Sequence, residues 1–279
     1  MKPLLRNRSM SIFKWALTML VALVILVPLY WILISSLKPT TDLFASPIDW
    51  FPRTLTLDNY KRLFSETNLV QQIVNTLIIA GASLIITTAA CLLGAYVFDR
   101  YRSKPFQIVF GAVLFSSLIP AIVTARPLYD YMNKLKLVNT FPGLILLYSS
   151  MLIPFTTLIL KNFLGGIPMT IDEAAEIDGA NTMQKLVYVI VPIMKPAIAT
   201  VCIINFISCL NEFFTPLIFS SSIETLSTGI ATLPRANSYD VPWELLSAMG
   251  CIILVPIILF VVAFEKKIMD GIMAGSVKE

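Results

Sequence analysis

The most concentrated set of reactive groups in this chain is a cluster of four carboxylates within seven residues. The cluster lies between two long apolar runs and consists of Asp172, Glu173, Glu176 and Asp178. A chain that is otherwise so apolar has little reason to keep such a cluster unless another group binds it. We interpret the segment as a docking element for a soluble partner protein.

Groups that could catalyse a reaction or bind a metal are scarce. The sequence has no histidine, which removes the commonest general base and metal ligand. Its four cysteines show no CxxC spacing, and we interpret them as small buried hydrophobic residues: Cys91, Cys202, Cys209 and Cys251. The chain has no Gly-x-x-x-x-Gly-Lys-Ser/Thr loop and should not bind or split ATP itself. We therefore expect no catalytic residue, no metal and no cofactor bound by this chain.

The composition is that of an integral membrane protein. Hydrophobic residues make up 57% of the chain and charged residues 14%, whereas soluble domains average about 45–50% and about 25%. The net charge is +4, but no patch of basic residues with aromatic residues between them occurs, so the sequence does not indicate nucleic-acid binding.

Six apolar runs meet the length of roughly 20 residues that a helix needs to cross a bilayer. We predict an all-α protein with one transmembrane domain over residues 1–279. The predicted spans are approximately residues 15–37, 69–98, 105–125, 137–160, 196–220 and 245–264. The acidic loop, residues 168–192, connects spans four and five. Several spans contain a proline that should kink its helix: Pro28, Pro120, Pro154, Pro216 and Pro256.

The distribution of basic residues predicts the orientation. Lysine and arginine are frequent before the first span, between spans two and three, and after the last span. The positive-inside rule then places both termini and the acidic loop in the cytoplasm. The basic loop 126–136 goes against this rule. The first apolar run is too long for a cleaved signal peptide, and we interpret it as a retained anchor.

Within the acidic loop, Thr170 and Glu173 have the spacing of a capping box. The pattern predicts a short helix over Ile171–Asp178, with Gly179 as its left-handed terminator. Asn181, followed by a glutamine three residues later, is expected to cap a second helix.

On the first of these helices, one face should carry Ile171, Ala174, Ala175 and Asp178, and its two alanines would let another backbone approach closely. The alternative is a helix that rests on lipid headgroups. Such helices are usually rich in lysine, arginine and large apolar residues, whereas this one is acidic and small.

Here the sequence resembles a family. Bacterial ABC importer permeases share a signature loop that contains Glu-Ala-Ala, then Gly, then Ile-x-Leu-Pro. This chain has a similar series, Glu173-Ala174-Ala175, Gly179 and Val189-Ile-Val191-Pro192. The two valines replace isoleucine and leucine and keep the apolar character.

Further segments resemble the carbohydrate-uptake branch of that family, and in particular the smaller permease subunit of the maltose transport system. They are Leu55-Thr-Leu-Asp58-Asn59-Tyr60, Pro127-Leu-Tyr129, Leu137-Val-Asn139-Thr140 with Gly143-Leu-Ile, Asn211-Glu212-Phe-Phe-Thr-Pro216 and Gly271-Ile-Met-Ala-Gly-Ser-Val-Lys278. A tryptophan often precedes the Asn211 position in the family, where this chain has Leu210.

The resemblance implies a multi-pass protein of the bacterial cytoplasmic membrane that works with a second permease subunit, two ATPase subunits and an extracytoplasmic solute-binding protein. ATP and magnesium would bind on the ATPase subunits. It also implies the residues that couple ATPase closure to alternating access: Thr170, Glu173, Ala174, Ala175, Asp178 and Gly179. Glu173 would contact a basic group on the ATPase.

The path of the sugar is less strongly indicated. Polar residues inside spans are costly and by default suggest function, and the candidates are Asn75, Tyr148, Asn205, Asn211 and Glu212. The alternative is hydrogen bonding between helices, which is common in membranes. The outer loop Ser221–Trp243 either reaches toward the binding protein or is a solvated connector.

Three other functions remain as alternatives: an ABC permease for a solute other than a sugar, a secondary transporter, and an intramembrane enzyme. A secondary transporter is disfavoured because we find no convincing internal repeat and no intramembrane aspartate. An intramembrane enzyme is disfavoured because no nucleophile–base pair is evident.

Overall fold

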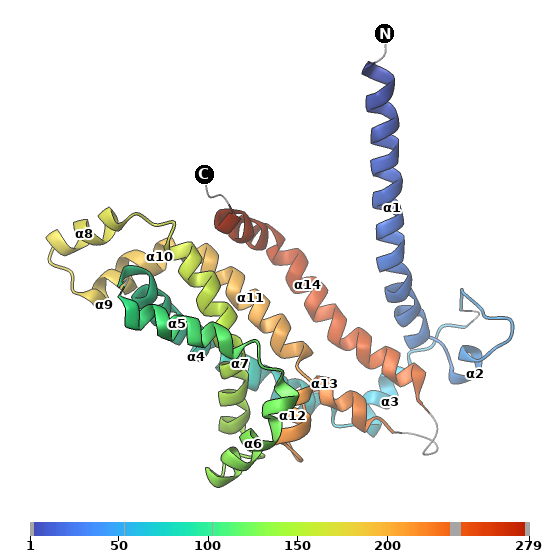
Figure 1. Cartoon of the computed structure of the whole chain (residues 1–279). Coiled ribbons are helices and arrows are strands. Elements are labelled where there is room, and N and C mark those ends of the chain that lie inside the picture. Colours follow the sequence, from blue (N-terminus) through green and yellow to red (C-terminus); the bar gives the residue numbers. More distant parts are fainter. Residues whose placement is uncertain (1–2, 53, 102, 235–240, 277–279) are drawn as a thin grey trace. The chain divides into compact units, whose positions relative to one another are not determined.

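The computed structural model of the chain describes residues 3–52, 54–101, 103–234 and 241–276. In these four stretches every regular element is a helix (Figure 1), which confirms the predicted all-α class. Residue contacts divide the chain into two compact units, which are described separately. The first unit contains Met1–Leu69 and Ile230–Val255, and the second contains Val70–Gly229 and Pro256–Glu279.

The first unit is built on α1 (Pro3–Ser36), the short α2 (Thr40–Leu43), α3 (Asp58–Glu66), the short 3-10 helix η2 (Ile230–Thr232) and the start of α14 (Trp243–Ser276). Buried Asn59 explains how α3 is held. Its side-chain amide donates to the carbonyls of Ser36, at 3.0 Å, and Lys38, at 2.8 Å, just where α1 ends.

Helix α1 is apolar over Phe13–Ser36, and none of its most hydrophobic window is buried within the chain. A helix that is apolar on every side must be covered by lipid or by another protein. This agrees with its prediction as a membrane span.

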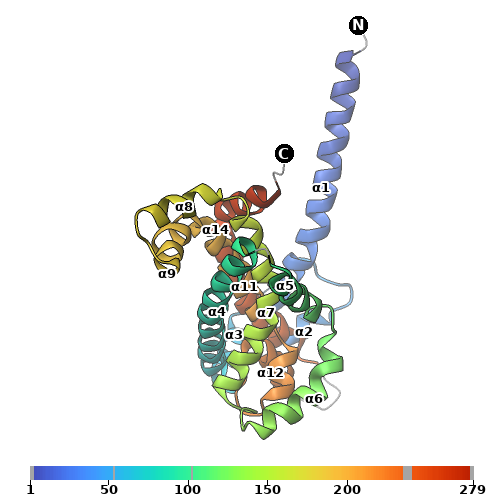
Figure 2. The ribbon, with the colours of Figure 1, turned by 60° about the vertical axis from the view of Figure 1, so that its left-hand side comes forward.

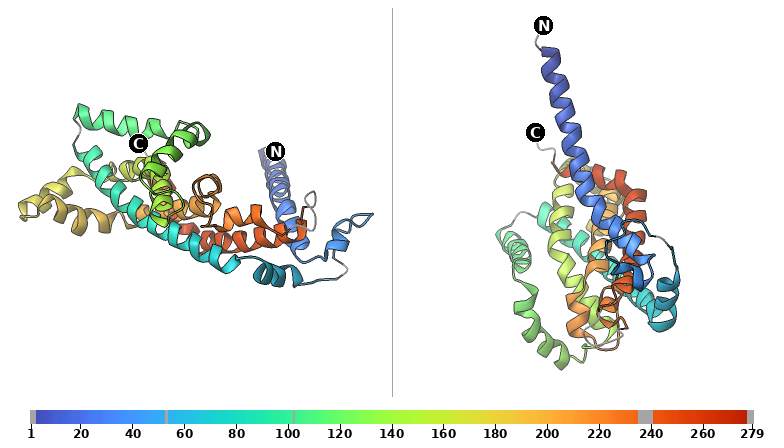
Figure 3. Two further views of the ribbon diagram at one scale, coloured as in Figure 1. Left: turned by 90° about the horizontal axis from the view of Figure 1, so that it is seen from below. Right: turned by 90° about the vertical axis from the view of Figure 1, so that its right-hand side faces the viewer.

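The second unit holds the remaining helices in chain order: α4 (Leu69–Arg100), α5 (Lys104–Ser116), α6 (Ala121–Lys134), α7 (Phe141–Leu164), α8 (Met169–Ile177), α9 (Thr182–Gln184), the π-helix η1 (Lys185–Ile190), α10 (Val191–Ile193), α11 (Lys195–Asn211), α12 (Phe214–Phe219) and α13 (Leu226–Gly229). Helix α7 is central to this unit, because it packs against α11, α5 and α12 (Figures 2 and 3).

Small polar side chains join α4 to α7. Ser83, Thr87 and Cys91 are spaced by four residues on one face of α4. Their side chains donate to the carbonyls of residues 145, 149 and 153 of α7, at 3.2, 3.5 and 3.5 Å. Such donors allow close packing where lipid removes the hydrophobic drive for helix association. Cys91, Cys209 and Cys251 are buried, which fits their interpretation as small buried residues, whereas Cys202 is half-buried.

Two apolar clusters complete the unit. One joins α4, α7, η1 and α11 and includes Cys91, Tyr96, Leu160, Ile190 and Val201. The other joins α4, α6, α7, α11 and α12 and includes Ile79, Met132, Leu144, Tyr148 and Phe219. The acidic loop therefore continues directly from a packed core.

The helices agree with a six-span protein, although not every predicted span is one straight helix. Three helices are long and apolar enough to cross a membrane, Phe13–Ser36, Leu69–Arg100 and Phe141–Leu164, and two bent pairs raise the number to five. The described apolar part of α14, Trp243–Leu259, is shorter.

Two spans predicted as continuous are broken. Between α5 and α6 the chain turns by 104° at Ser117–Pro120. Proline has no N–H and disfavours a helical conformation in the residue before it, which accounts for the break at Pro120. The predicted span 196–220 also breaks, because α11 ends at Asn211 and Glu212 is extended.

Candidate coupling site

The acidic loop begins with α8, which starts at Met169 with Pro168 as its N-cap residue. The predicted capping box of Thr170 and Glu173 is wrong. Thr170 lies inside the first turn of α8, and the N-cap residue Pro168 makes no side-chain hydrogen bond to the helix. The reason is Pro168, whose ring fixes φ, here at −57°. With an extended ψ of 142°, Pro168 becomes the N-cap, two residues earlier than the Thr170 pattern suggested.

The end of α8 is as predicted. Gly179 has a φ of +83°, and the N–H groups of Gly179 and Ala180 donate to the carbonyls of Glu176 and Ala175 at 3.0 and 2.9 Å. This left-handed ending satisfies the last carbonyls of the helix. No atom lies within 4 Å of the position that a Cβ would take, so the glycine is required by backbone conformation and not by space.

The second capping box is confirmed. Asn181 accepts from the N–H of Gln184 at 2.9 Å, and the Gln184 side chain accepts from the N–H of Asn181 at 2.8 Å. The loop then continues as a π-helix, where Lys185 forms an ion pair with Glu176 at 2.9 Å. The loop is thus a hairpin of two helical segments joined at Gly179.

Asp172 belongs to a buried ionic cluster that the sequence analysis missed. Its carboxylate accepts from the Tyr96 hydroxyl at 2.9 Å and pairs with Arg100 at 2.8 Å. Arg100 also pairs with Asp99 at 2.8 Å and donates to the carbonyl of Ile167 at 3.2 Å. The charged side chains of this cluster are only 7–8% exposed. The cluster therefore fastens the base of α8 to the end of α4.

A signal for this cluster is present in the sequence. Asp99 and Arg100 are the first charges after the long uncharged run of span two, and they begin the predicted cytoplasmic loop. We interpreted Arg100 only as an orientation signal and Asp172 only as a member of the acidic cluster.

Burial divides the face of α8 on which we placed Ile171, Ala174, Ala175 and Asp178. Ala175 is 9% exposed and faces the chain's own interior, whereas Ala174 and Asp178 are exposed. Asp172, which was not placed on that face, is 6% exposed. Ile177, which the prediction left out, is 87% exposed. The other predicted coupling residues are exposed: Thr170, Glu173, Ala174, Asp178 and Gly179. The exposed residues of α8 are therefore largely acidic, with one small apolar residue, Ala174, and two large ones, Ile177 and Met169, which is 47% exposed.

Most candidate sugar-path residues are occupied by contacts within the chain. Tyr148 is 2% exposed and donates to the carbonyl of Glu212 at 3.4 Å. Asn205 is buried and exchanges hydrogen bonds with Thr156 at 2.8 and 3.2 Å. Asn75 donates to the carbonyl of Glu224 at 2.8 Å.

Asn211 and Glu212 differ from these because they are not buried. The Glu212 carboxylate accepts from the N–H of Thr215 at 2.7 Å, which starts α12 on the far side of the break.

The loop after α12 is held by Asn139. Its side-chain oxygen accepts hydrogen bonds of 2.9–3.0 Å from Ser220, Ser221 and Ser222. Asn139 has a φ of +60°, a conformation that asparagine tolerates better than most residues. The Leu137–Thr140 segment therefore holds the start of loop 221–243 in place through Asn139.

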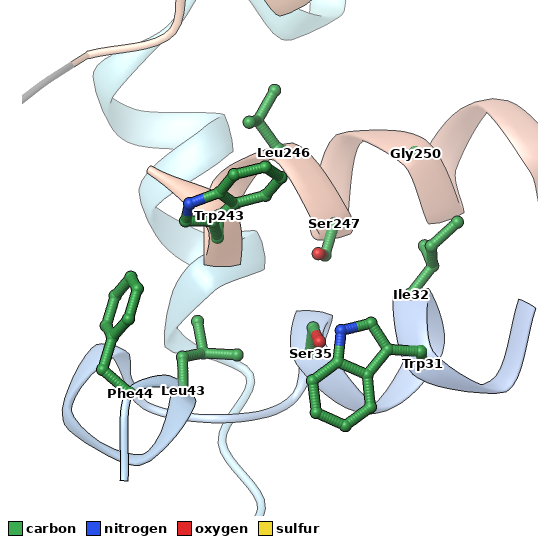
Figure 4. Close-up of a pocket in the computed structure, with 9 residues that line it drawn as sticks. All are labelled: Trp31, Ile32, Ser35, Leu43, Phe44, Trp243, Leu246, Ser247 and Gly250. Carbon is green, nitrogen blue, oxygen red and sulfur yellow. The ribbon is translucent and has the colours of Figure 1, made fainter. Parts of the chain in front are cut away.

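A separate cavity of about 470 Å³ lies within the first unit (Figure 4). Its walls are mainly apolar and include Trp31, Leu43 and Trp243, while Ser35 and Ser247 supply hydroxyl groups. It contains none of the site residues predicted from the sequence. Among the described residues no cluster of three or more metal-ligating side chains occurs.

Comparison with known proteins decides the family. Residues 86–270 match the family described as "Binding-protein-dependent transport system inner membrane component". The chain belongs to this family.

Several curated relatives match most of the chain. The sulfoquinovosyl glycerol transport system permease protein SmoH of Agrobacterium fabrum is 32% identical over 255 residues, 91% of this chain and 89% of SmoH. The trehalose transport system permease protein SugB of Mycobacterium tuberculosis is 32% identical and covers 91% of this chain and 92% of its own length. The trehalose/maltose permease MalG of Thermococcus litoralis is 30% identical, over 93% and 94%.

The fold is also found in a solved structure. A crystal structure of a bacterial ABC transporter involved in the import of the acidic polysaccharide alginate matches with a TM-score of 0.79 at 22% identity, over 94% of this chain and 97% of that one. This inner membrane component therefore has a known transporter fold, and α8 with its hairpin lies inside the family match.

Proposed function

We propose that this protein is the membrane-spanning permease subunit of an ATP-driven ABC importer for a carbohydrate. The observation that carries the proposal is the arrangement of α8, whose buried side is fastened to the transmembrane core while its open side is left for a partner. An element built this way can receive a push on one side and pass it to the spans on the other.

The fastening gives this coupling a physical route. Asp172 at the start of α8 pairs directly with Arg100 at the end of α4, with the two charged groups 2.8 Å apart. When a partner displaces α8, the charge pair resists separation, because leaving either buried charge alone costs several kcal/mol. Helix α4 should therefore move with α8 as a rigid body.

The partner in this proposal is an ATPase subunit. Glu173 and Asp178 on the open side would pair with basic groups of that subunit, and the protruding Ile177 would fill an apolar depression. This chain would bind no ATP or magnesium. A second permease subunit would complete the channel and cover α1, and an extracytoplasmic binding protein would deliver the solute. Both termini would lie in the cytoplasm.

The carbohydrate class is supported by the relatives, whose names specify trehalose, trehalose or maltose, and sulfoquinovosyl glycerol. These sugars differ in chemistry, and the solved neighbour handles an acidic polysaccharide. The relatives therefore favour a sugar without choosing its charge.

Affinity purification from detergent-solubilised membranes tests the coupling role. The test variant combines Glu173→Lys with Gly179→Val, since both positions are exposed and outside the ionic cluster. The matched control is Glu66→Lys, an exposed acidic residue of α3. We expect wild type and control to retain a second permease and an ATPase, and the test variant to lose only the ATPase. A wild-type chain that purifies alone, or a test variant that keeps its ATPase, would refute the proposal.

A further inference from the structure

A cavity of about 560 Å³ lies within the second unit, beside the break between α5 and α6. Its wall also includes residues of α7 and the start of α12. Unlike the apolar cavity of Figure 4, it is lined by several hydroxyl groups and one carboxylate. These polar groups belong to Ser116, Ser117, Thr124, Ser150, Thr215 and Glu212.

Two interruptions of membrane helices meet at this cavity. The first is the turn of 104° at Ser117–Pro120, and the second is the extended residue Glu212 between α11 and α12. Non-helical backbone at membrane depth is tolerated where protein buries it or where it lines a polar cavity. Residues of both breaks line the cavity, namely Ser117, Pro120 and Glu212.

Four of the five hydroxyl groups around the cavity have their protons already engaged. Each donates to the carbonyl three residues earlier in its own helix: Ser116 at 2.7 Å, Ser117 at 2.7 Å, Thr124 at 3.1 Å and Ser150 at 2.7 Å. What these side chains can still offer to a ligand is therefore their oxygen lone pairs. A set of acceptors of this kind selects a ligand rich in hydroxyl donors.

Glu212 adds selection by the charge of the ligand. Its carboxylate is held in place by the N–H of Thr215 at 2.7 Å, and a carboxylate is also an acceptor and carries negative charge. It would strengthen hydrogen bonds from neutral sugar hydroxyls and repel a sugar that carries a carboxylate. Pro154, Leu147 and Phe214 supply apolar surface for the C–H faces of a sugar ring.

We propose that this cavity is a sugar-binding subsite on the translocation path, selective for a neutral, hydroxyl-rich sugar unit. The proposal rests on the proposed function as a carbohydrate importer. It gives this chain a direct part in holding the sugar, through Glu212 and Ser150 rather than through the buried Tyr148 and Asn205.

Thiol protection in reconstituted proteoliposomes tests the subsite. The four native cysteines are replaced by alanine, and Ser150→Cys is introduced for reaction with a small cationic methanethiosulfonate. The probes are trehalose, maltose and diacetylchitobiose as neutral sugars and digalacturonate as an anionic one, each with the binding protein and ATP. We expect a transported neutral sugar at ten times its half-saturating concentration to slow labelling about tenfold. The control is Ser208→Cys, whose native hydroxyl makes the same kind of helix bond away from the cavity.

Uptake by two further variants gives an independent measurement. Glu212→Gln keeps an acceptor for Thr215 but removes the charge, and it should slow neutral-sugar uptake about tenfold; Ser150→Ala should slow it roughly threefold. Ser208→Ala should match wild type.

The outcomes separate the subsite from the importer. If wild type transports a neutral sugar but the sugar does not protect Ser150→Cys, or if that thiol is unreactive because lipid or the second permease fills the cavity, the subsite is wrong and the importer stands. If the assembled complex transports none of the sugars, the carbohydrate assignment fails with it. Uptake of digalacturonate by wild type overturns the charge selection.

Discussion

Arg100 and Asp172 form a buried ion pair, with Nη2 and Oδ2 2.8 Å apart, between the end of α4 and the first turn of α8. Both side chains are less than a tenth exposed, and each has one further partner: the Tyr96 hydroxyl donates to Asp172, and Asp99 pairs with Arg100. Because both partners of the pair belong to this chain, α8 is held in its orientation without a partner protein. A partner that docks on α8 therefore meets a preformed surface.

Removing one member of this pair should be costly. Asp172→Asn leaves Arg100 with reduced compensation in a buried setting, and we expect a loss of about 3 kcal/mol in the stability of the loop. Limited proteolysis within residues 165–190 should become faster, and sugar-stimulated ATPase activity should fall. The matched control is Glu176→Gln, which removes the charge of an exposed carboxylate paired with Lys185 and should cost less than about 1 kcal/mol. Equal behaviour of the two variants would contradict the role of the buried pair.

Gly179 should be sensitive to backbone conformation and insensitive to side-chain size. Its φ of +83° disfavours β-branched residues, whereas open space surrounds its missing Cβ. Gly179→Val should therefore uncouple ATP hydrolysis from uptake, at a strain of about 1–2 kcal/mol, while Gly179→Asn should retain most coupling. Both variants should insert normally into the membrane. If asparagine is as harmful as valine, the turn requires glycine for contact with the partner and not for its own conformation.

Gly143, in contrast to Gly179, is required because there is no space for a larger side chain. A Cβ there would lie 1.9 Å from the carbonyl oxygen of Leu137. Gly143→Ala should displace the start of α7 and lower the thermal stability of the purified complex, by about 2 kcal/mol or more. Gly81→Ala in α4 is the matched control, since nothing lies within 4 Å of its Cβ position, and it should be neutral or slightly stabilising. Similar melting temperatures for the two variants would contradict this account.

The sequence predicted the parts of this protein that depend on local pattern. Apolar runs located the spans, Gly179 ended its helix and Asn181 capped the next one. Pattern could not assign Asp172, because its partner Arg100 lies 72 residues away in the chain and only tertiary packing brings them together.

Pattern also treated polar residues in spans as equivalent. Asn205 has its hydrogen bonds satisfied by Thr156, whereas Glu212 lies at a helix break beside a cavity. Only the three-dimensional arrangement distinguishes a polar residue that holds helices together from one that is available to a ligand.

The pairing of Thr156 with Asn205 leads to the last prediction. Each donates to or accepts from the other at 2.8–3.2 Å in a buried position, so either single change leaves the partner unsatisfied. Thr156→Val and Asn205→Leu should each lower the stability of the complex by about 1 kcal/mol. The double variant should lose less than the sum of the two, because both polar groups are then gone. Thermal unfolding of the purified complex measures this cycle, and uptake by the double variant should stay near that of wild type. A double variant that is stable but transports no sugar would mean that Asn205 contacts the sugar after all.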